Sequence, residues 1–331
     1  MAAASSPPSD SELHDALGRA LTEAGVGFPR EIRRRPFEYR TSFPLEELDV
    51  ELEDGTELRL VFKDLGWAGL DEEARLAKPE FLHDPLREPA VYASVLAPAD
   101  FGAPRYYGSA IDPGAGRCWL FIERVEGREL YQVGNLELWR TAGSWLGEMH
   151  LALAEDLERH AERGRLIDYD AAFYRRWMDR AREFATAPDL PASRAESLGR
   201  LAERYDSVVE GLLDLPKTVI HGEFYASNVL VGDGATPRVC PVDWELAATG
   251  PGLVDLAALI SGGWSEGDRE AIVAAYRSAV GGAFSPAQLD LCRLHLAVQW
   301  LGWAPPSWTP PEEQRHDWLD EALTLAERLH L

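Results

Sequence analysis

The residues best suited to chemistry lie close together in the second half of the chain. Asn228 ends the stretch HGEFYASN (221–228), and Asp243 lies within VDWE (242–245). An amide oxygen and a carboxylate are hard oxygen ligands of the kind that Mg²⁺ prefers. Both residues flank a hairpin predicted around 232–234, so their side chains can face one site. The pattern indicates a magnesium site; the competing interpretation is a hairpin with ordinary polar turn residues.

A lysine ends a predicted strand in the first half of the chain. It is Lys63, in LVFK (60–63), and only three of the 33 Lys and Arg residues are lysine. Where arginine is so strongly preferred, a lysine on a sheet suggests that a compact ammonium is needed there. The alternative is an ordinary solvated salt bridge.

Together these motifs resemble the aminoglycoside phosphotransferase and choline kinase family, which shares the protein-kinase-like fold. The family writes its first motif H-G-D-x-x-x-x-N and places an Asp in its second, as VDWE does here. The resemblance covers roughly residues 30–300. It implies an α+β, two-lobed fold with a small antiparallel-sheet lobe and a larger, mostly helical lobe. It also implies ATP and Mg²⁺ as cofactors and a hydroxyl acceptor that is aminoglycoside-like, choline-like or a sugar. Phosphoryl transfer needs positioning and charge neutralisation more than covalent help, which agrees with these residues.

The resemblance assigns roles within the two motifs. Asp243 becomes the principal metal ligand and Asn228 the second. Glu223 takes the position of the family's catalytic Asp, which accepts or orients the proton of the attacking hydroxyl. Glu adds one methylene, and a misplacement of about 1 Å can cost about 100-fold in rate. Either the loop backbone compensates, or the enzyme is slow, or the chain is a pseudokinase.

Further roles follow from the same resemblance. His221 packs the loop and hydrogen-bonds backbone, the alternatives being a catalytic base or a metal ligand. Asp255 braces the loop through backbone N–H groups, although an Asp also suits a helix N-terminus. Lys63 contacts the nucleotide phosphates and pairs with a helix glutamate, for which Glu88 is the candidate.

The nucleotide site is less clearly marked. No glycine-rich loop is evident in RTSFP (40–44), where the hydroxyls of Thr41 and Ser42 could contact phosphate instead. The segment 122–125 is expected to connect the lobes. There the Glu123 carbonyl and the Val125 N–H would pair with the adenine edge.

The patterns also predict the elements that position these residues. Ser9 and Glu12 form a capping box that opens a helix at 9–24. Alternating strands at 48–52 and 58–62 flank the hairpin signal Asp54-Gly55. A helix at 85–96 and strands at 104–109 and 118–122 follow. Helices are predicted at 136–154, 173–184 and 195–213, short β elements at 218–231 and 238–244, and helices from 254 onward. The expected division is a tail and helix (1–29), a small lobe (30–122), a hinge (123–127) and a large lobe (128–331) with a helical insertion (155–216).

Composition excludes several classes of protein. The net charge of −23 disfavours binding to nucleic acid or anionic membranes. It would attract a cationic small substrate, and the alternative is an acidic surface that is simply well solvated. No apolar run is long enough to span a membrane, and no signal peptide is indicated. Three isolated cysteines fit a reducing cytoplasm. The oligomeric state stays open.

Two further questions stay open at this level. Four tryptophans, Trp300, Trp303, Trp308 and Trp318, are either core residues or an aromatic wall of the acceptor pocket. The acceptor could also be a peptide Ser/Thr in natural-product maturation. A nucleotide-binding pseudokinase acting as a regulator is the alternative that is not an enzyme.

Overall fold

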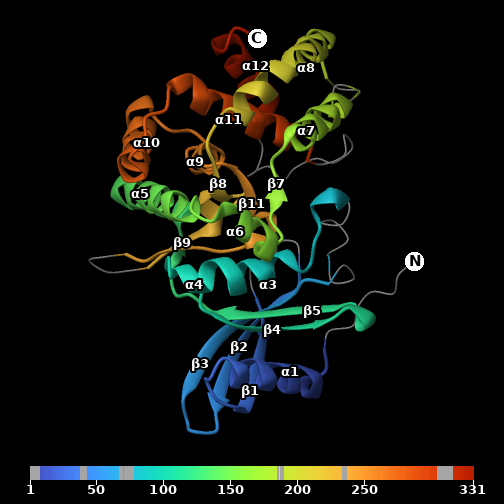
Figure 1. The fold of residues 1–331 in the computed structure, drawn as a ribbon, viewed down its shortest axis with the longest axis vertical. Coiled ribbons are helices and arrows are strands. Elements are labelled where there is room, and N and C mark those ends of the chain that lie inside the picture. The colour runs from blue at the N-terminus through green and yellow to red at the C-terminus, as the bar shows by residue number, and fades with distance from the viewer. Residues whose placement is uncertain are drawn as a thin grey trace.

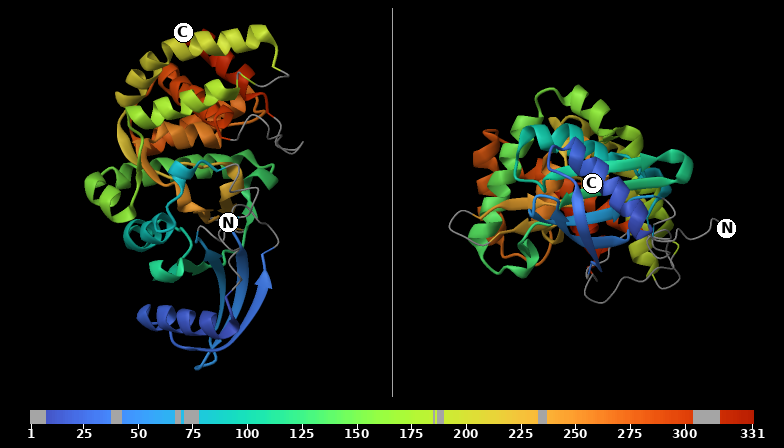
Figure 2. Two further views of the ribbon diagram at one scale, coloured as in Figure 1. Left: turned by 90° about the vertical axis from the view of Figure 1, so that its right-hand side faces the viewer. Right: turned by 90° about the horizontal axis from the view of Figure 1, so that it is seen from below.

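The chain forms two lobes stacked along its long axis (Figures 1 and 2). The computed structural model describes residues 8–37, 43–66, 70, 78–184, 186, 190–232, 237–303 and 316–331. A sheet and helix α1 form the small lobe, and helices α7, α8, α11 and α12 lie at the opposite end of the molecule. This arrangement confirms the predicted two-lobed α+β fold.

The small lobe is built on an antiparallel sheet. Among the described residues it has five strands in the order β1-β2-β3-β5-β4. They are β1 (Pro29–Pro36), β2 (Leu45–Leu52), β3 (Glu57–Asp64), β4 (Tyr106–Asp112) and β5 (Arg117–Glu123). The predicted Asp54-Gly55 turn joins β2 to β3, and the register pairs Glu51 with Glu57 and Leu45 with Lys63. This register places Lys63 at the end of β3 that is farthest from the turn.

Helix α1 (Asp10–Glu23) covers one face of this sheet. The predicted capping box is present, with the Ser9 hydroxyl and the Glu12 carboxylate satisfying each other's backbone N–H groups. Gly108 allows the helix to approach β4 closely, because a Cβ there would lie 2.6 Å from the Cβ of Ala20. The contact between α1 and the sheet forms a small core of its own.

The opposite face of the sheet packs on the predicted helix 85–96. This helix begins two residues later than predicted, as α3 (Arg87–Val91), and passes through a π-helical turn (Tyr92–Leu96) into α4 (Ala97–Ala99). Successive side chains of β3 and β5 therefore point into two different hydrophobic cores, one on each face of the sheet. Leu60 and Phe62 face α1, whereas Val61 belongs to the main core with Tyr92. Strand β5 is buried on both faces, which fits its continuous run of apolar residues at 118–122.

The larger lobe is mostly helical. Its helices are α5 (Leu136–Leu153), α6 (Leu157–Gly164), α7 (Ala171–Phe184), α8 (Ala192–Leu213), α9 (Leu253–Leu259), α10 (Glu266–Val280), α11 (Pro286–Leu301) and α12 (Trp318–Arg328). Helix α6, within the predicted insertion, was not predicted from the sequence. Within the described ranges, no helix combines the length and apolar character needed to cross a bilayer.

Short strands carry the loops between these helices. One small sheet has the order β10-β9-β6 and another the order β7-β11-β8. The strands are β6 (Arg128–Glu129), β7 (Ile167–Asp168), β8 (Lys217–Ile220), β9 (Val229–Val231), β10 (Val239–Pro241) and β11 (Ala248–Pro251). The predicted hinge 123–127 begins at the last residue of β5 and ends just before β6, and its role as a hinge stays a prediction.

The β elements predicted at 218–231 and 238–244 are only partly strand. Strand β8 pairs with β11, and only 229–231 and 239–241 pair as the predicted hairpin. The prediction was wrong for 221–228 and 242–244, which are loop and turn. The backbone N–H groups of His221 and Gly222 bond to the carboxylate of Asp255, so they are not available for a strand ladder.

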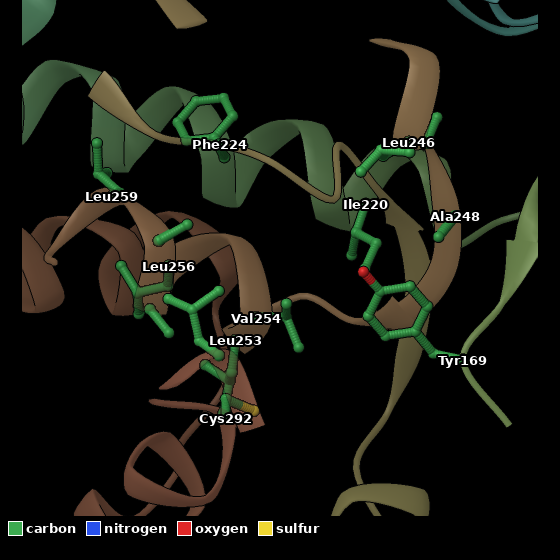
Figure 3. Close-up of a cluster of buried hydrophobic side chains, with 14 of the residues drawn as sticks. Tyr169, Ile220, Phe224, Leu246, Ala248, Leu253, Val254, Leu256, Leu259 and Cys292 are labelled. Carbon is green, nitrogen blue, oxygen red and sulfur yellow. The ribbon is translucent and has the colours of Figure 1, made fainter. Parts of the chain in front are cut away.

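A buried apolar cluster supports the loop at 221–228 (Figure 3). Ile220 and Phe224 bracket the start of the loop, and both are fully buried. Leu246 and Tyr169 lie beside Ile220, while Val254 and the other apolar residues of α9 pack below. The loop is therefore anchored from beneath by side chains of several elements, which limits its movement.

Candidate active site

A buried lysine joins the two lobes. The Lys63 ammonium donates to Glu88 Oε1 at 2.7 Å and to Asp243 Oδ1 at 3.1 Å. Glu88 lies on α3 of the small lobe, and Asp243 follows β10 of the large lobe. Lys63 and Glu88 are 6% and 1% exposed, so solvent screens their interaction little.

The charges of this group are set by burial and by each other. Burial opposes the charge on Lys63, but the carboxylates of Asp243 and Glu88 together raise the pKa of the ammonium above its usual value. Burial also acts to raise the pKa of Asp243, but the Lys63 ammonium holds that pKa below its ordinary value. The site therefore contains an ionised Lys63 against an ionised Asp243.

The loop at 221–228 is fixed by a buried carboxylate. Asp255 on α9 accepts the backbone N–H of His221 at 2.7 Å and that of Gly222 at 3.0 Å. His150 on α5 adds a contact, with Nε2 3.2 Å from Asp255 Oδ2, and its Nδ1 lies 3.0 Å from the Tyr276 hydroxyl. His150 was not identified from the sequence, because nothing near it in the chain suggests its partner.

The His221 ring links the loop to the turn that carries Asp243. Its Nε2 lies 2.9 Å from the Val242 carbonyl, which can only accept, so Nε2 carries the proton. Its Nδ1 then accepts the Glu223 N–H at 3.2 Å. Burial lowers the pKa of His221, which favours this neutral form. With both ring nitrogens engaged by backbone, the imidazole has no free nitrogen for a metal.

Backbone geometry turns the two motifs toward each other. Gly222 has φ +85°, and a Cβ there would collide with the Leu246 carbonyl oxygen. Asp243 has φ 66°, in the left-handed region, which Asp tolerates better than most residues do. These two positions bring 221–228 and 242–246 into direct contact.

The polar side chains at this contact could hold Mg²⁺. The Asn228 amide group donates to the Glu223 carbonyl at 3.0 Å, which leaves its side-chain oxygen to accept or to bind a metal. The backbone N–H of Val242, the residue before Asp243, donates to the Asn228 carbonyl at 2.9 Å and holds the two motifs together. In the part of the chain that the structure describes, no three His, Cys, Asp or Glu side chains cluster as a complete metal site. A site with few protein ligands suits Mg²⁺ held partly by phosphate oxygens of a nucleotide.

Glu223 lies among other carboxylates. Burial, together with the nearby charges of Glu245 and Asp243, raises the pKa of Glu223 to about 8, while the Lys78 ammonium acts in the opposite direction. Once ionised, a carboxylate with a raised pKa is a stronger base than an exposed glutamate. This chemistry fits proton abstraction from a hydroxyl group.

Three residues at the site were not predicted from the sequence. Lys78, before the short helix at Glu80–Leu82, forms an ion pair with Glu245 of the large lobe. Arg87 on α3 donates to the Glu245 carbonyl at 2.7 Å and to the Leu82 carbonyl at 2.9 Å. The sequence did contain signals, because Lys78 is one of only three lysines and Glu245 follows Asp243 by two positions.

The predicted adenine and phosphate contacts are placed only in part. Glu123 ends β5, and its carboxylate binds Arg238 at 2.6 and 2.8 Å, so its side chain is engaged within the protein. Val125 lies in the connection between the lobes. Ser42 is outside the described residues. The nucleotide roles of all three stay predictions.

Aromatic side chains extend from the loop into the helical lobe. The Trp300 indole donates to the Tyr225 hydroxyl at 2.6 Å. Trp300 stacks on Trp318 with ring centroids 5.4 Å apart and lies 6.2 Å from Trp303, which stacks on Trp177 at 5.8 Å. Trp177 is fully buried, whereas the other four rings are partly exposed. The predicted tryptophan group thus serves both as core and as a partly exposed surface, and Trp308 lies outside the described residues.

Comparisons with known proteins agree with this geometry. No curated protein matches the chain. Among solved structures, an aminoglycoside-3′-phosphotransferase of type VIII is 20% identical, with 86% of this chain and 99% of that chain covered and a TM-score of 0.55. The GDP complex of aminoglycoside 2′-phosphotransferase-IIIa is 14% identical (93% and 95% covered, TM-score 0.58). Choline kinase from Cryptosporidium parvum is 13% identical (90% and 88% covered, TM-score 0.55).

These similarities concern the fold. The sequence itself matches the model of the Phosphotransferase enzyme family over residues 50–292, a span that includes Lys63, Glu88, Asn228 and Asp243. Since this span is most of the chain, the chain belongs to the Phosphotransferase enzyme family.

Proposed function

We propose that the chain is an ATP-dependent kinase that phosphorylates a hydroxyl group of a small molecule. The observation that carries this proposal is the bridge from Lys63 to Glu88 and Asp243, which brings a buried cation of one lobe against a carboxylate of the other. Phosphoryl transfer depends on this kind of placed charge, because negative charge is spread over the phosphate oxygens in the transition state.

The residues divide the work as follows. Asp243 and the Asn228 amide oxygen hold Mg²⁺, which neutralises phosphate charge when it binds with ATP. Lys63, oriented by Glu88, contacts the phosphates. Glu223 accepts the proton of the attacking hydroxyl. The adenine edge pairs with the backbone of the connection at 123–125.

The acceptor is a small molecule that presents a ring face or a cation. The partly exposed rings beside the catalytic loop would support either group by stacking or by a cation–π contact. The net charge of −23 would draw cationic acceptors toward the protein. Solved structures of similar fold are named for aminoglycosides and choline, which are both small molecules.

A nucleotide-binding pseudokinase is the second candidate. The specific observation in its favour is Glu223, which stands where the resembling family has the shorter Asp. The retained Lys63, Asn228 and Asp243 argue against it, since together they provide the placed charges that phosphoryl transfer requires.

Turnover and binding, measured together, separate these candidates. The purified chain is given Mg·ATP with aminoglycosides, choline-like alcohols, sugars or a Ser-containing peptide, and ADP release is followed by a coupled assay. We expect release that depends on Mg²⁺ and on a small hydroxyl acceptor. Binding of Mg·ATP by calorimetry without turnover of any acceptor would support the pseudokinase, and phosphorylation of the peptide alone would support a peptide kinase. No binding of any purine triphosphate at millimolar concentration would exclude all of them.

A further inference from the structure

Two lysines of the small lobe pair with two carboxylates of one turn in the large lobe. Lys63 contacts Asp243, and Lys78 contacts Glu245. Both lysines are buried, being 6% and 7% exposed. The third lysine of the chain, Lys217, instead forms a partly exposed pair with Asp168 on the surface of the large lobe. The rare lysines are thus concentrated where the lobes meet.

The Lys78 ammonium lies beside the turn that carries Asp243, because its partner Glu245 follows Asp243 by two positions. Its charge lowers the pKa of Glu223 and that of Asp243, although burial has the largest effect on both. Its ammonium also lies 5.3 Å from the centre of the Phe43 ring, on the side of the small lobe. The ion pair with Glu245 thus places a second ammonium at the turn that also carries Asp243.

The pair with Glu245 is costly as a purely structural device. Burying an ammonium and a carboxylate carries a desolvation penalty that their attraction often fails to recover.

The segment that joins β1 to β2, residues 37–44, contains no glycine, so the chain lacks a glycine-rich loop there to surround phosphates with backbone N–H groups. A mobile ammonium can supply the missing positive charge.

On the basis of the function proposed above, we propose that Lys78 leaves Glu245 when Mg·ATP binds and donates to the oxygens of the transferred phosphoryl group. The acceptor hydroxyl oxygen forms a bond to the γ-phosphorus while the bond from that phosphorus to the β–γ bridging oxygen breaks. ADP leaves with the electron pair, and the hydroxyl proton passes to Glu223. Lys78 stabilises the charge on the non-bridging oxygens during this step.

The competing role is a purely structural tie between the lobes. A structural tie would act only through Glu245. If Lys78 were such a tie, the activity lost on replacing Lys78 would be recovered when Glu245 is replaced as well. A phosphoryl-binding role predicts instead that Lys78→Met and the double variant Lys78→Met/Glu245→Gln are equally impaired. Glu245→Gln alone would free Lys78, so it should bind a transition-state mimic at least as tightly as the wild type does.

The experiment measures turnover with ATP and calorimetric binding of Mg·ADP with and without aluminium fluoride, which mimics the transferred phosphoryl group. We expect Lys78→Met to lower kcat by about 10²–10³-fold. It should weaken the aluminium fluoride complex by a similar factor and leave Mg·ADP binding unchanged. Lys78→Arg should restore part of this loss, and the control Lys217→Met should match the wild type. Melting temperatures establish that each variant is folded.

Several results would overturn this role. Recovery of wild-type turnover in the double variant would make Lys78 a structural tie. Wild-type kcat in Lys78→Met, or equal losses of Mg·ADP binding with and without aluminium fluoride, would also exclude it. If Lys78→Met does not fold, Glu245→Gln decides the question, because weaker binding of the mimic would contradict the proposal. Failure of the proposed function itself is recognised separately, since the wild type would then phosphorylate no acceptor, whether or not it binds Mg·ADP.

Discussion

The two sides of the junction between the lobes carry opposite charges on different kinds of support. The small lobe contributes Lys63 and Lys78, whose ammonium groups stand on long, flexible stems. The large lobe contributes Glu223, Asp243 and Glu245. The backbone of Glu223 is held by His221 and Asn228, the turn that carries Asp243 is tied to His221 through the Val242 carbonyl, and the Glu245 carbonyl accepts from Arg87. The difference indicates that the carboxylates form the fixed part of the site, while the cations can move between carboxylates and phosphates.

The largest expected effect comes from removing the fixed charge that faces Lys63. Asp243→Asn should lower kcat on the order of 10⁴-fold, because Mg²⁺ and developing negative charge lose their main support. The change keeps the size of the side chain, so folding should be retained. Turnover and the Mg²⁺ dependence of ATP binding measure the loss. Wild-type turnover in this variant would show that the metal ligand lies elsewhere.

The second effect concerns the carboxylate with the longest reach. Glu223→Gln removes the titratable carboxyl group at constant length and should lower kcat by about 10²–10³-fold, because no base is left to accept the hydroxyl proton. Glu223→Asp keeps the charge but shortens the side chain, and it should also lower kcat, because the loop is fitted to the longer residue. A sharp rise in activity for Glu223→Asp would reveal an attenuated kinase. Equal low rates for Gln and wild type with every acceptor would remove Glu223 from catalysis.

A third change tests whether the large-lobe side is fixed by Asp255. Asp255→Asn replaces a charged acceptor of two backbone N–H groups and should reduce the free energy of unfolding by about 2 kcal/mol. It should also lower kcat, since the loop at 221–228 loses its brace. Urea unfolding and turnover provide the two measurements. An unchanged stability would mean that the apolar cluster beneath the loop holds it without this carboxylate.

The smallest effect concerns the loss of folding stability at acid pH, which we expect to come partly from a histidine that is not among the charged groups between the lobes. Burial lowers the pKa of His295 on α11 to about 3. An unfolded chain protonates histidine near pH 6.5, so below that pH the unfolded state binds more protons and stability falls as the pH falls toward 3. Between pH 7 and pH 5 this group should cost about 2 kcal/mol.

His295→Gln is the matched variant for this effect. It should lose less stability than the wild type between pH 7 and pH 5, measured by urea unfolding at each pH. The same loss in both proteins would place the acid sensitivity at other groups, including those where the lobes meet.

Features that depend on residues close together in the chain could be predicted from the sequence, whereas contacts between distant segments could not. The Ser9–Glu12 capping box and the Asp54-Gly55 turn act between near neighbours in the chain, and both are present. The two-lobed fold was predicted through the resemblance in the motifs at 221–228 and 242–245. The pair of Lys78 with Glu245 joins residues 167 positions apart and exists only once the lobes pack.

Local patterns failed where backbone groups bond to side chains. The segment 221–228 has apolar residues suited to a strand, but the Asp255 carboxylate takes its first N–H groups and Gly222 adopts a positive φ. Neither feature is visible in hydrophobic alternation. The same holds for β7 and β11, which are too short to give a periodic signal.

The separate core beneath α1 has a consequence for how the molecule opens. Among the described residues, Leu13, Leu17 and Leu21 pack with the face of the sheet opposite α3, in a cluster distinct from the main core. Helix α1 can therefore detach from the sheet in a partial unfolding event during which the large, helical lobe stays folded. Amide hydrogen exchange in α1 should report this local opening at a lower free energy than exchange in α9 or α11. Because β3 carries Lys63 and contributes Leu60 and Phe62 to that same cluster, ligands that hold Lys63 in place should slow exchange in α1.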